Sequence, residues 1–305
     1  MKKLLITGGT VFVSRFVADY FKNKYDVYVL NRNTRQQVKG VRLIEADRHN
    51  LQNQLKSYHF DAVIDVCAYN KKDIKDLCEA INDVRDYIFI SSSAVYPQDN
   101  PQSFQEEQEI GYNSIWKQYG IDKIHAEKYL LSRYPQAYIL RPPYLYGPMQ
   151  NIYREPFVFE CALKNRPFYI PKDGSMKLQF FHVEDLCKMI DIILQKHPQD
   201  HILNVGNEDV VDIKTFVELC YEVAGQPLVL KSVNHFQQRD YFCFYDYGYV
   251  LDVSKQKHLL KEIKELKEGL RESFQWYVHH QEDVNRKNYI QFIDENLSNK
   301  IEHRF

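Results

Sequence analysis

Short apolar runs alternate with helical patterns through the first half of the chain, and this order constrains the fold more than any other feature. Strands this apolar need cover on both faces, and the crossover helices that join parallel strands supply it. The sequence therefore predicts an α/β fold built on a doubly wound parallel sheet. The predicted strands are residues 3–6, 26–30, 41–45, 61–66, 87–91 and 137–141, and the predicted helices are residues 12–24, 71–82 and 117–133.

The pattern changes after "RPPYLYGP", where the sequence becomes irregular, aromatic and interrupted by prolines. A helical pattern, "FFHVEDLCKMIDIIL", and a strand pattern, "ILNVG", then resume within residues 176–206. We expect a first domain at residues 1–147, to which residues 176–206 return. A smaller, interleaved lobe with C-terminal helices is expected over residues 148–305.

The charge balance argues against a nucleic-acid or membrane partner. Forty basic and 41 acidic residues give a formal net charge of −1, so the chain has no excess positive charge for an anionic polymer or lipid surface. No apolar run reaches the roughly 18 residues of a membrane span. Six scattered cysteines without a C-x-x-C pair indicate free thiols and no metal site. We expect a cytoplasmic protein, because such thiols suit a reducing compartment.

The segment "LLITGGTVFVSRFVADYF" places a glycine turn between the first strand and the first helix. Backbone N–H groups at such a turn can bind a pyrophosphate, and Gly8 would provide the sharp bend. The usual G-x-x-G-x-x-G pattern would carry glycine at Val11 and Ser14. The turn alone therefore leaves two interpretations open, a cofactor site and a structural turn.

The second strand ends in "VYVLNRN", with Asn31 where NAD-binding units usually carry an acid that binds the ribose hydroxyls. An acid would repel a 2′-phosphate, whereas Asn31 followed by Arg32 would not, and Arg15 adds a second cation. The sequence thus favours NADP slightly over NAD.

The spacing Tyr-x-x-x-Lys places a phenol and an ammonium group one helical turn apart, where the ammonium can lower the pKa of the phenol. The spacing occurs at Tyr20–Lys24 and at Tyr119–Lys123, and a chain with 23 tyrosines is expected to contain such pairs by chance. Only the second pair follows a strand that ends in serines, "YIFISSSAVYP", at the edge where open sheets bind ligands. We predict that Tyr119 and Lys123 are catalytic and that the first pair is structural.

Eight segments occur in one order: "TGGTVFVS", "DAVIDVCAY", "SSSAVYP", "YGIDK", "LRPPYLYGP", "FFHVEDL", "NVGN" and "LDVSK". In this order the chain resembles the extended short-chain dehydrogenases/reductases of the NAD-dependent epimerase/dehydratase family, which act mainly on nucleotide sugars. The resemblance covers about residues 3 to 277. It implies a Rossmann sheet that binds the dinucleotide, a smaller substrate-binding lobe, and the possibility of a homodimer.

The resemblance also implies roles for individual residues. Ser92 would share the proton of the reacting oxygen, Tyr119 would be the general acid/base, and Lys123 would lower its pKa and hold the nicotinamide ribose. The implied cofactor-binding residues are Gly8, Thr10, Phe12 and Val13 on the phosphate turn, Asp47 beside adenine, and Ala68 beside the ribose, in addition to Asn31 and Arg32 at the end of the second strand, which are expected from the residues themselves.

Departures from the family pattern narrow the expected reaction. Family 4,6-dehydratases carry an acid just after the serine, where this chain has Ser93 and Ala94. Family 3,5-epimerase/reductases carry a cysteine at the position of Ala94. Tyr144 stands where many family epimerases have an asparagine that touches the substrate. C4 epimerisation and ketone reduction remain, with Ser93 and Tyr144 as candidate substrate contacts.

The aromatic run from Phe236 to Tyr249 has two interpretations, packing of the smaller lobe and stacking on a nucleotide. Packing is favoured, and Arg239 is a candidate contact for a substrate phosphate.

We expect an NAD(P)-dependent epimerase or ketoreductase that acts on a nucleotide sugar or a related carbonyl or hydroxyl compound. One alternative is an NADP-dependent reductase of a small carbonyl compound that is not a sugar. The other is a non-catalytic module that senses a cofactor or binds RNA. The altered glycine turn favours this module, and the complete Ser/Tyr/Lys set disfavours it.

Overall fold

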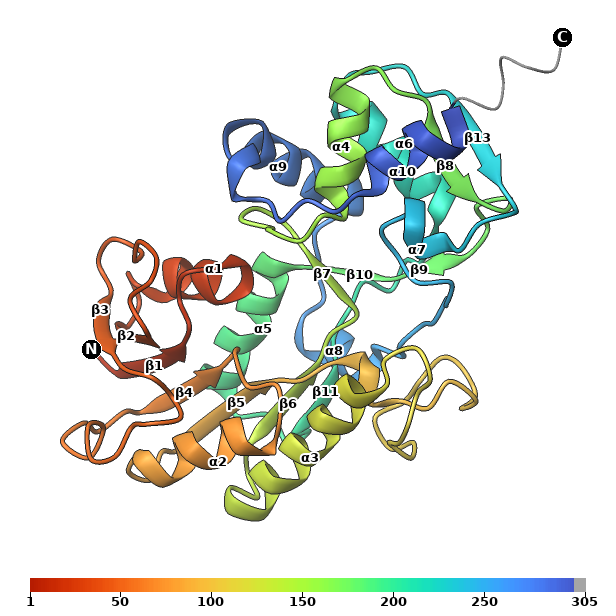
Figure 1. Ribbon diagram of the computed structural model, residues 1–305. Helices are drawn as coiled ribbons and strands as arrows, with labels where there is room; N and C mark the ends of the chain where they lie inside the picture. Colours follow the sequence, from red (N-terminus) through yellow and green to blue (C-terminus); the bar gives the residue numbers. More distant parts are fainter. Residues whose placement is uncertain (299–305) are drawn as a thin grey trace, which may run out of the picture. The chain divides into compact units, whose positions relative to one another are not determined.

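The computed structural model describes residues 1–298, and residues 299–305 of the expected second lobe lie outside the described residues. The chain forms two compact units, shown in Figure 1. The first comprises Met1–Leu145, Phe180–Glu208 and Val250–Ile263. The second comprises Tyr146–Gln179, Asp209–Tyr249 and the chain from Lys264. The inclusion of Val250–Ile263 in the first unit is a feature that the strand and helix patterns do not indicate.

The first unit is built on a seven-stranded sheet with the order β11-β6-β5-β4-β1-β2-β3. The register of its neighbouring strands is parallel, for example Leu4 opposite Val27 and Ala62. This confirms the predicted doubly wound α/β fold, in which the strand order reverses between β1 and β4. The strands are β1 (Lys3–Thr7), β2 (Asp26–Asn31), β3 (Arg42–Glu45), β4 (Ala62–Asp65), β5 (Asp86–Ile90), β6 (Tyr138–Arg141) and β11 (Ile202–Asn204).

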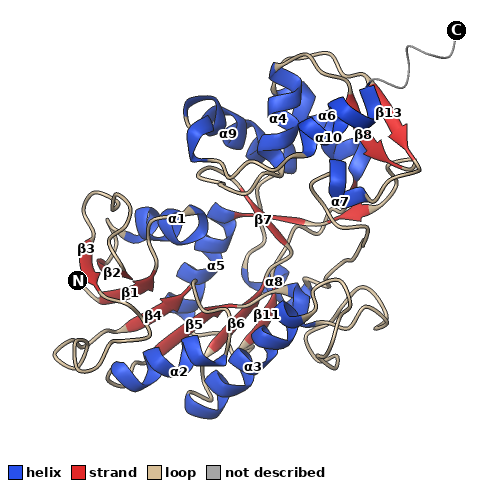
Figure 2. Cartoon of the chain, in the orientation of Figure 1, coloured by secondary structure: helices blue, strands red, loops and turns tan. Residues whose placement is uncertain are grey.

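Helices cover both faces of this sheet, as Figures 1 and 2 show. Residues such as Ile6 and Val29 face one layer of helices, and Leu5 and Val63 face the other, so successive residues alternate between two apolar cores. The first layer contains α1 (Phe12–Phe21) and α5 (Val183–Lys196), and the second contains α2 (Lys71–Ala80) and α3 (Gln118–Arg133). The remaining elements of this unit are the 3-10 turn η1 (Ser93–Val95), β10 (Phe180–His182), α8 (Ser254–Leu259) and the strand paired with β10, β7 (Tyr144–Tyr146), whose last residue belongs to the second unit.

The second unit combines helices with two short strand pairs. Its apolar packing includes the aromatic run, since Tyr241, Phe242, Phe244 and Tyr249 are each less than 5% exposed. Lobe packing, the favoured interpretation of that run, agrees with this burial. The elements are α4 (Glu155–Leu163), β8 (Phe168–Pro171), β9 (Lys177–Leu178), β12 (Val211–Asp212), α6 (Ile213–Val223), β13 (Leu230–Val233), α7 (Gln238–Tyr241), α9 (Leu266–His279), η2 (Gln281–Asp283), α10 (Tyr289–Ile293) and a π-helical turn, η3 (Asp294–Ser298).

Among the described residues, no helix is both long enough and apolar enough to cross a membrane. All six cysteines are free thiols, and five of them are buried.

Candidate active site

The turn after β1 depends on two glycines. Gly8 and Gly9 have φ angles of 88° and 90°, a region that other residues rarely adopt. A Cβ atom at Gly8 would lie 2.6 Å from Cys67 Sγ, and one at Gly9 would collide with Val29. The sharp bend therefore needs glycine at both positions.

Val11 and Ser14 fit this turn without the freedom of glycine. Val11 is extended, with φ −134° and ψ 135°, which a β-branched residue adopts readily. The Ser14 hydroxyl is buried and donates a hydrogen bond to the Val11 carbonyl at 2.9 Å. The left-handed conformation falls on Phe12, with φ 34°, a strained position for a side chain of this size. The departures from the glycine pattern thus leave the strand–turn–helix geometry intact.

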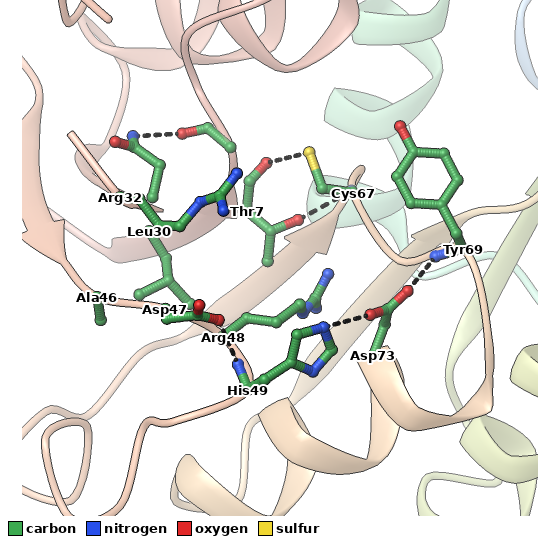
Figure 3. A pocket seen from close by; sticks show the side chains of 12 residues that line it. Thr7, Leu30, Arg32, Ala46, Asp47, Arg48, His49, Cys67, Tyr69 and Asp73 are labelled. Atoms are coloured by element: carbon green, nitrogen blue, oxygen red, sulfur yellow. Dashed lines mark hydrogen bonds and ion pairs between the residues drawn. The ribbon is translucent and has the colours of Figure 1, made fainter. Parts of the chain in front are cut away.

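A pocket of about 320 Å³ opens at the carboxyl edge of the sheet, around β1, β2, β3 and β4. Four residues predicted to bind cofactor line it: Gly8, Asn31, Arg32 and Asp47. The other predicted contacts, Thr10, Phe12, Val13, Ala68 and Lys123, are not among its lining residues. Figure 3 shows the lining, which also includes Thr7, Leu30, Ala46, Arg48, His49, Cys67, Tyr69 and Asp73.

Asn31 supports the glycine turn. Its amide nitrogen donates to the Gly8 carbonyl at 2.7 Å, and its amide oxygen accepts from the Asn33 N–H at 2.9 Å. Arg32 is exposed at the pocket and forms no ion pair with the described residues. The pocket therefore presents an uncommitted guanidinium group beside the end of β2.

A buried carboxylate that the sequence analysis missed lies beneath this edge. Asp65, at the end of β4, is fully buried and accepts three hydrogen bonds. The donors are Thr7 Oγ1 at 2.7 Å, Arg48 Nη2 at 2.7 Å and the Tyr87 hydroxyl at 2.8 Å. The available signal was an acid inside the apolar strand "DAVIDV", because an acid is rarely buried without partners.

These bonds extend to Lys123, the lysine predicted to be catalytic. Thr7 Oγ1 accepts from the N–H groups of Val66 and Cys67 at 3.0 and 3.1 Å, which fixes the loop after β4. The next residue of that loop, Ala68, accepts a hydrogen bond from Lys123 Nζ through its carbonyl at 2.7 Å. Ala68 is fully buried, and in this structure it holds the lysine through its backbone.

Lys123 is 3% exposed, and its second acceptor is the Ile90 carbonyl at 2.9 Å. Burial lowers the pKa of Lys123 to about 8, and the negative charges of Asp65 and Glu127 oppose the shift. The group therefore titrates near pH 8, well below an ordinary lysine.

Tyr119 and Ser92 meet where α3 begins and β5 ends. The two side chains share a hydrogen bond, and the Lys123 Nζ atom lies 6.0 Å from the centre of the Tyr119 ring. Burial of the hydroxyl raises the pKa of Tyr119, and the bond with Ser92 opposes this. The helix can come this close because residue 120 is glycine. A Cβ atom there would collide with the Ala94 carbonyl oxygen. The sequence analysis also missed Gly120, although it directly follows the tyrosine.

The predicted substrate contacts lie in different surroundings. Ser93 is buried, and its N–H donates to the Pro142 carbonyl at 3.0 Å. Tyr144, at the start of β7, is half-buried, with its ring 6.1 Å from that of Phe180. In the second unit, Arg239 Nη1 donates to the Phe242 and Cys243 carbonyls. These bonds give Arg239 a structural task at the end of α7.

Comparisons with known proteins agree with the fold. The model of the NAD dependent epimerase/dehydratase family matches residues 4–206. The chain is 25% identical over 302 residues to chloroplast stem-loop binding protein of 41 kDa b from Arabidopsis thaliana, covering 90% of this chain and 78% of that protein. It is 29% identical to probable GDP-L-fucose synthase 1 from Oryza sativa, covering 64% of this chain and 63% of the relative.

Two solved structures illustrate the likeness in fold. One is a UDP-N-acetylglucosamine 4-epimerase from Methanobrevibacter ruminantium, with a TM-score of 0.77 and 19% identity over 91% of this chain and 98% of the other. The second is a dTDP-glucose 4,6-dehydratase from Bacillus anthracis in complex with NAD, with a TM-score of 0.75 and 20% identity over 93% of this chain and 99% of the other. At these identities the likeness shows the fold alone.

Proposed function

The chain belongs to the NAD dependent epimerase/dehydratase family of extended short-chain dehydrogenases/reductases, and we propose from this that it moves hydride between a carbon of a nucleotide sugar and a nicotinamide dinucleotide. The reaction is C4 epimerisation or reduction of a ketone. The observation that carries the proposal is the group formed by Ser92, Tyr119 and Lys123 at the sheet edge that also holds the pocket.

The residues of the pocket fit the adenosine half of such a dinucleotide. The absence of a side chain at Gly8 opens the turn toward the pocket, and a Cβ atom there would already meet Cys67 and Ser14. Asp47 is exposed in the lining and can accept from an amino group of adenine. Gly8 and Asp47 would thus hold the phosphates and the base.

The bound nicotinamide supplies an acceptor or a donor for hydride. When the substrate is oxidised, Tyr119 takes the proton of the substrate hydroxyl group as hydride leaves the carbon that bears this group. When the ketone is reduced, Tyr119 returns that proton to the oxygen. Ser92 donates a hydrogen bond to the reacting oxygen, and the Lys123 ammonium favours the ionised form of Tyr119.

The proposed cofactor is NADP in preference to NAD. Arg32 lines the pocket without an ion pair among the described residues, and a 2′-phosphate would be a bidentate partner for its guanidinium group. Wild-type protein should bind NADPH more tightly than NADH, and Arg32→Ala should reduce the difference. Equal dissociation constants in the wild type, measured by nicotinamide fluorescence, would contradict the preference.

The proposed substrate is a nucleotide sugar, because solved relatives of this fold carry such ligands, among them the epimerase above in complex with UDP-N-acetylmuramic acid. Ser93 and Tyr144 are the proposed contacts. Dehydration is not proposed, since neither Ser93 nor Ala94 can act as the acid that removes water.

The test is turnover of a panel of UDP-, GDP- and dTDP-sugars by the protein with NADP⁺, NADPH, NAD⁺ or NADH. Epimers are separated by chromatography, and net reduction is followed at 340 nm. Conversion of one sugar supports the proposal. Reduction of a small non-sugar carbonyl compound alone would show that the substrate belongs to that class instead. Failure to bind any of the four dinucleotides would contradict the proposal that the protein is an enzyme of this kind.

A second function deserves a test because the stem-loop binding relative covers 90% of the chain. A stem-loop RNA titrated at low salt in a mobility-shift assay distinguishes the two functions. Binding that weakens as salt rises would support RNA recognition. A failure to bind at low salt would remove it.

A further inference from the structure

Tyr69 is an exposed aromatic residue with a fixed backbone. The residue follows the fully buried Ala68 in the chain, yet it is 57% exposed. Its N–H donates to the Asp73 carboxylate at 2.7 Å, and Asp73 also forms the capping box that starts α2 with Asn70. The Tyr69 hydroxyl makes no hydrogen bond with the described residues. The loop is thus held firmly, and the ring is left in the lining of the pocket (Figure 3).

The position of Tyr69 along the sheet edge is between two functional groups of residues. Arg32 and Asp47 follow β2 and β3, Tyr69 follows β4, and Ser92 follows β5. Because the strands are ordered β3-β2-β1-β4-β5, Tyr69 lies on the way from the proposed adenosine contacts to the catalytic residues. Figure 3 agrees, with Tyr69 beside Cys67 and Asp73 and away from Arg32 and Ala46.

The ring of Tyr69 also adjoins the catalytic lysine. Lys123 Nζ lies 5.4 Å from the centre of the Tyr69 ring and 6.0 Å from that of Tyr119. One buried ammonium group is therefore flanked by two phenol rings, and only Tyr119 shares a hydrogen bond with Ser92. The two rings have different tasks.

The task of Tyr69 belongs to its ring and not to its hydroxyl. Partial burial raises the pKa of Tyr69, as burial also does at Tyr119, so the two residues are separated by the bond with Ser92, which Tyr119 has and Tyr69 lacks. An exposed aromatic face inside a pocket is suited to packing against a planar or apolar part of a ligand.

We infer that the Tyr69 ring is the wall against which the nicotinamide half of the dinucleotide packs, which makes Tyr69 a binding and positioning residue. This inference rests on the proposed function, because it concerns the ligand of the same site. Tyr69 separates the adenosine contacts from Tyr119, so packing on its ring holds the nicotinamide half at the catalytic end of the pocket.

Binding measurements test the inference without a substrate. Dissociation constants are measured for NADPH by nicotinamide fluorescence, and for 2′,5′-ADP, which lacks the nicotinamide half, by calorimetry. The proteins are the wild type, Tyr69→Ala, Tyr69→Phe and the control Tyr112→Ala. Tyr112 is a matched control because it is 61% exposed and does not line the pocket.

We expect Tyr69→Ala to bind NADPH about tenfold more weakly and 2′,5′-ADP unchanged. Tyr69→Phe and Tyr112→Ala should bind both as the wild type does. An unchanged affinity of Tyr69→Ala for NADPH, an equal loss for both ligands, or a loss in Tyr69→Phe as large as in Tyr69→Ala would each overturn the inference. A folded wild type that binds neither NADPH nor NADH overturns the proposed function itself, and the inference with it.

Discussion

The chain contains the same motif twice, and the two copies differ in everything except spacing. Tyr20 lies in the last turn of α1 and Lys24 follows the helix, where Lys24 Nζ pairs with Asp191 at 2.6 Å and contacts the Tyr20 hydroxyl at 3.4 Å. Tyr119–Lys123 lies at the start of α3, where Lys123 is bound by two backbone carbonyls. The side chain of Lys24 is 44% exposed, whereas Lys123 is 3% exposed.

The surroundings shift the pKa values of the two ammonium groups in opposite directions. Burial works against the charge of Lys24, but the bond with Asp191 outweighs it and raises the pKa. Burial dominates at Lys123 and lowers the pKa to about 8. The same spacing thus brings a phenol and an ammonium together at both places, and burial at the sheet edge is what gives Lys123 its lowered pKa.

Replacement of the lysine in each pair should give the largest difference in turnover between the two pairs. Lys123→Met should lower turnover of the nucleotide sugar by about 100-fold or more, because Tyr119 loses the charge that favours its ionised form. Lys24→Met should stay within about twofold of the wild type, because Lys24 is itself exposed and does not line the pocket. Steady-state kinetics on both variants measures this. Equal losses of turnover would contradict the claim that only the second pair supports the reaction.

Stability should depend on pH with opposite signs at the two lysines. Between pH 8 and about 10.5 the unfolded chain holds a proton that folded Lys123 has lost, so this residue makes the fold more stable as pH rises, by about 3 kcal/mol in total. Lys24 keeps its proton longer when folded, so its contribution is complete below pH 10.5 and is lost as pH rises through its folded pKa.

Urea unfolding from pH 7 to pH 10.5 measures this dependence as the free-energy difference between the wild type and each methionine variant. The difference for Lys123→Met should move in favour of the wild type as pH rises. A difference that is flat over this range would contradict the low pKa of Lys123.

The glycine that follows Tyr119 provides the next test. Gly120→Ala should force α3 away from the Ala94 carbonyl, costing about 1–3 kcal/mol of stability and lowering turnover by weakening the Tyr119–Ser92 bond. Chemical denaturation and kinetics on one sample measure both effects. A variant that keeps full stability and turnover would show that the close approach of α3 is unnecessary.

The smallest effect is expected at the partner of Lys24. Asp191→Asn should cost no more than about 1 kcal/mol, as for other partly exposed ion pairs, and should leave turnover unchanged. A loss of turnover in a folded Asp191→Asn protein would show that the first pair contributes to function.

The sequence carried enough information for the strand–helix order, and through it for the edge at which Ser92 and Tyr119 lie. Apolar periodicity and helical spacing are local, so the place of Lys123 on the same helix as Tyr119 could be predicted as well. Asp65 and Gly120 could not be, because their roles depend on partners 58 and 26 residues away, Thr7 and Ala94. Arg239 shows the converse, since its position in an aromatic segment predicts a ligand contact but does not indicate its bonds to nearby carbonyls.

The glycine turn makes the same point in physical terms. The pattern marks Val11 and Ser14 as departures, but a residue type alone does not reveal the φ angle it must adopt. In the structure the left-handed conformation falls on Gly8, Gly9 and Phe12, and Val11 is extended.

The central claim is that the second tyrosine–lysine pair, and not the first, moves the proton that accompanies hydride transfer. The most direct measurement is single turnover of the nucleotide sugar converted by the wild type, comparing Tyr119→Phe with Tyr20→Phe at saturating cofactor. We predict a loss of about 100- to 10,000-fold in Tyr119→Phe with unchanged cofactor affinity, and wild-type rates in Tyr20→Phe. Retained turnover in a folded Tyr119→Phe protein would contradict the account.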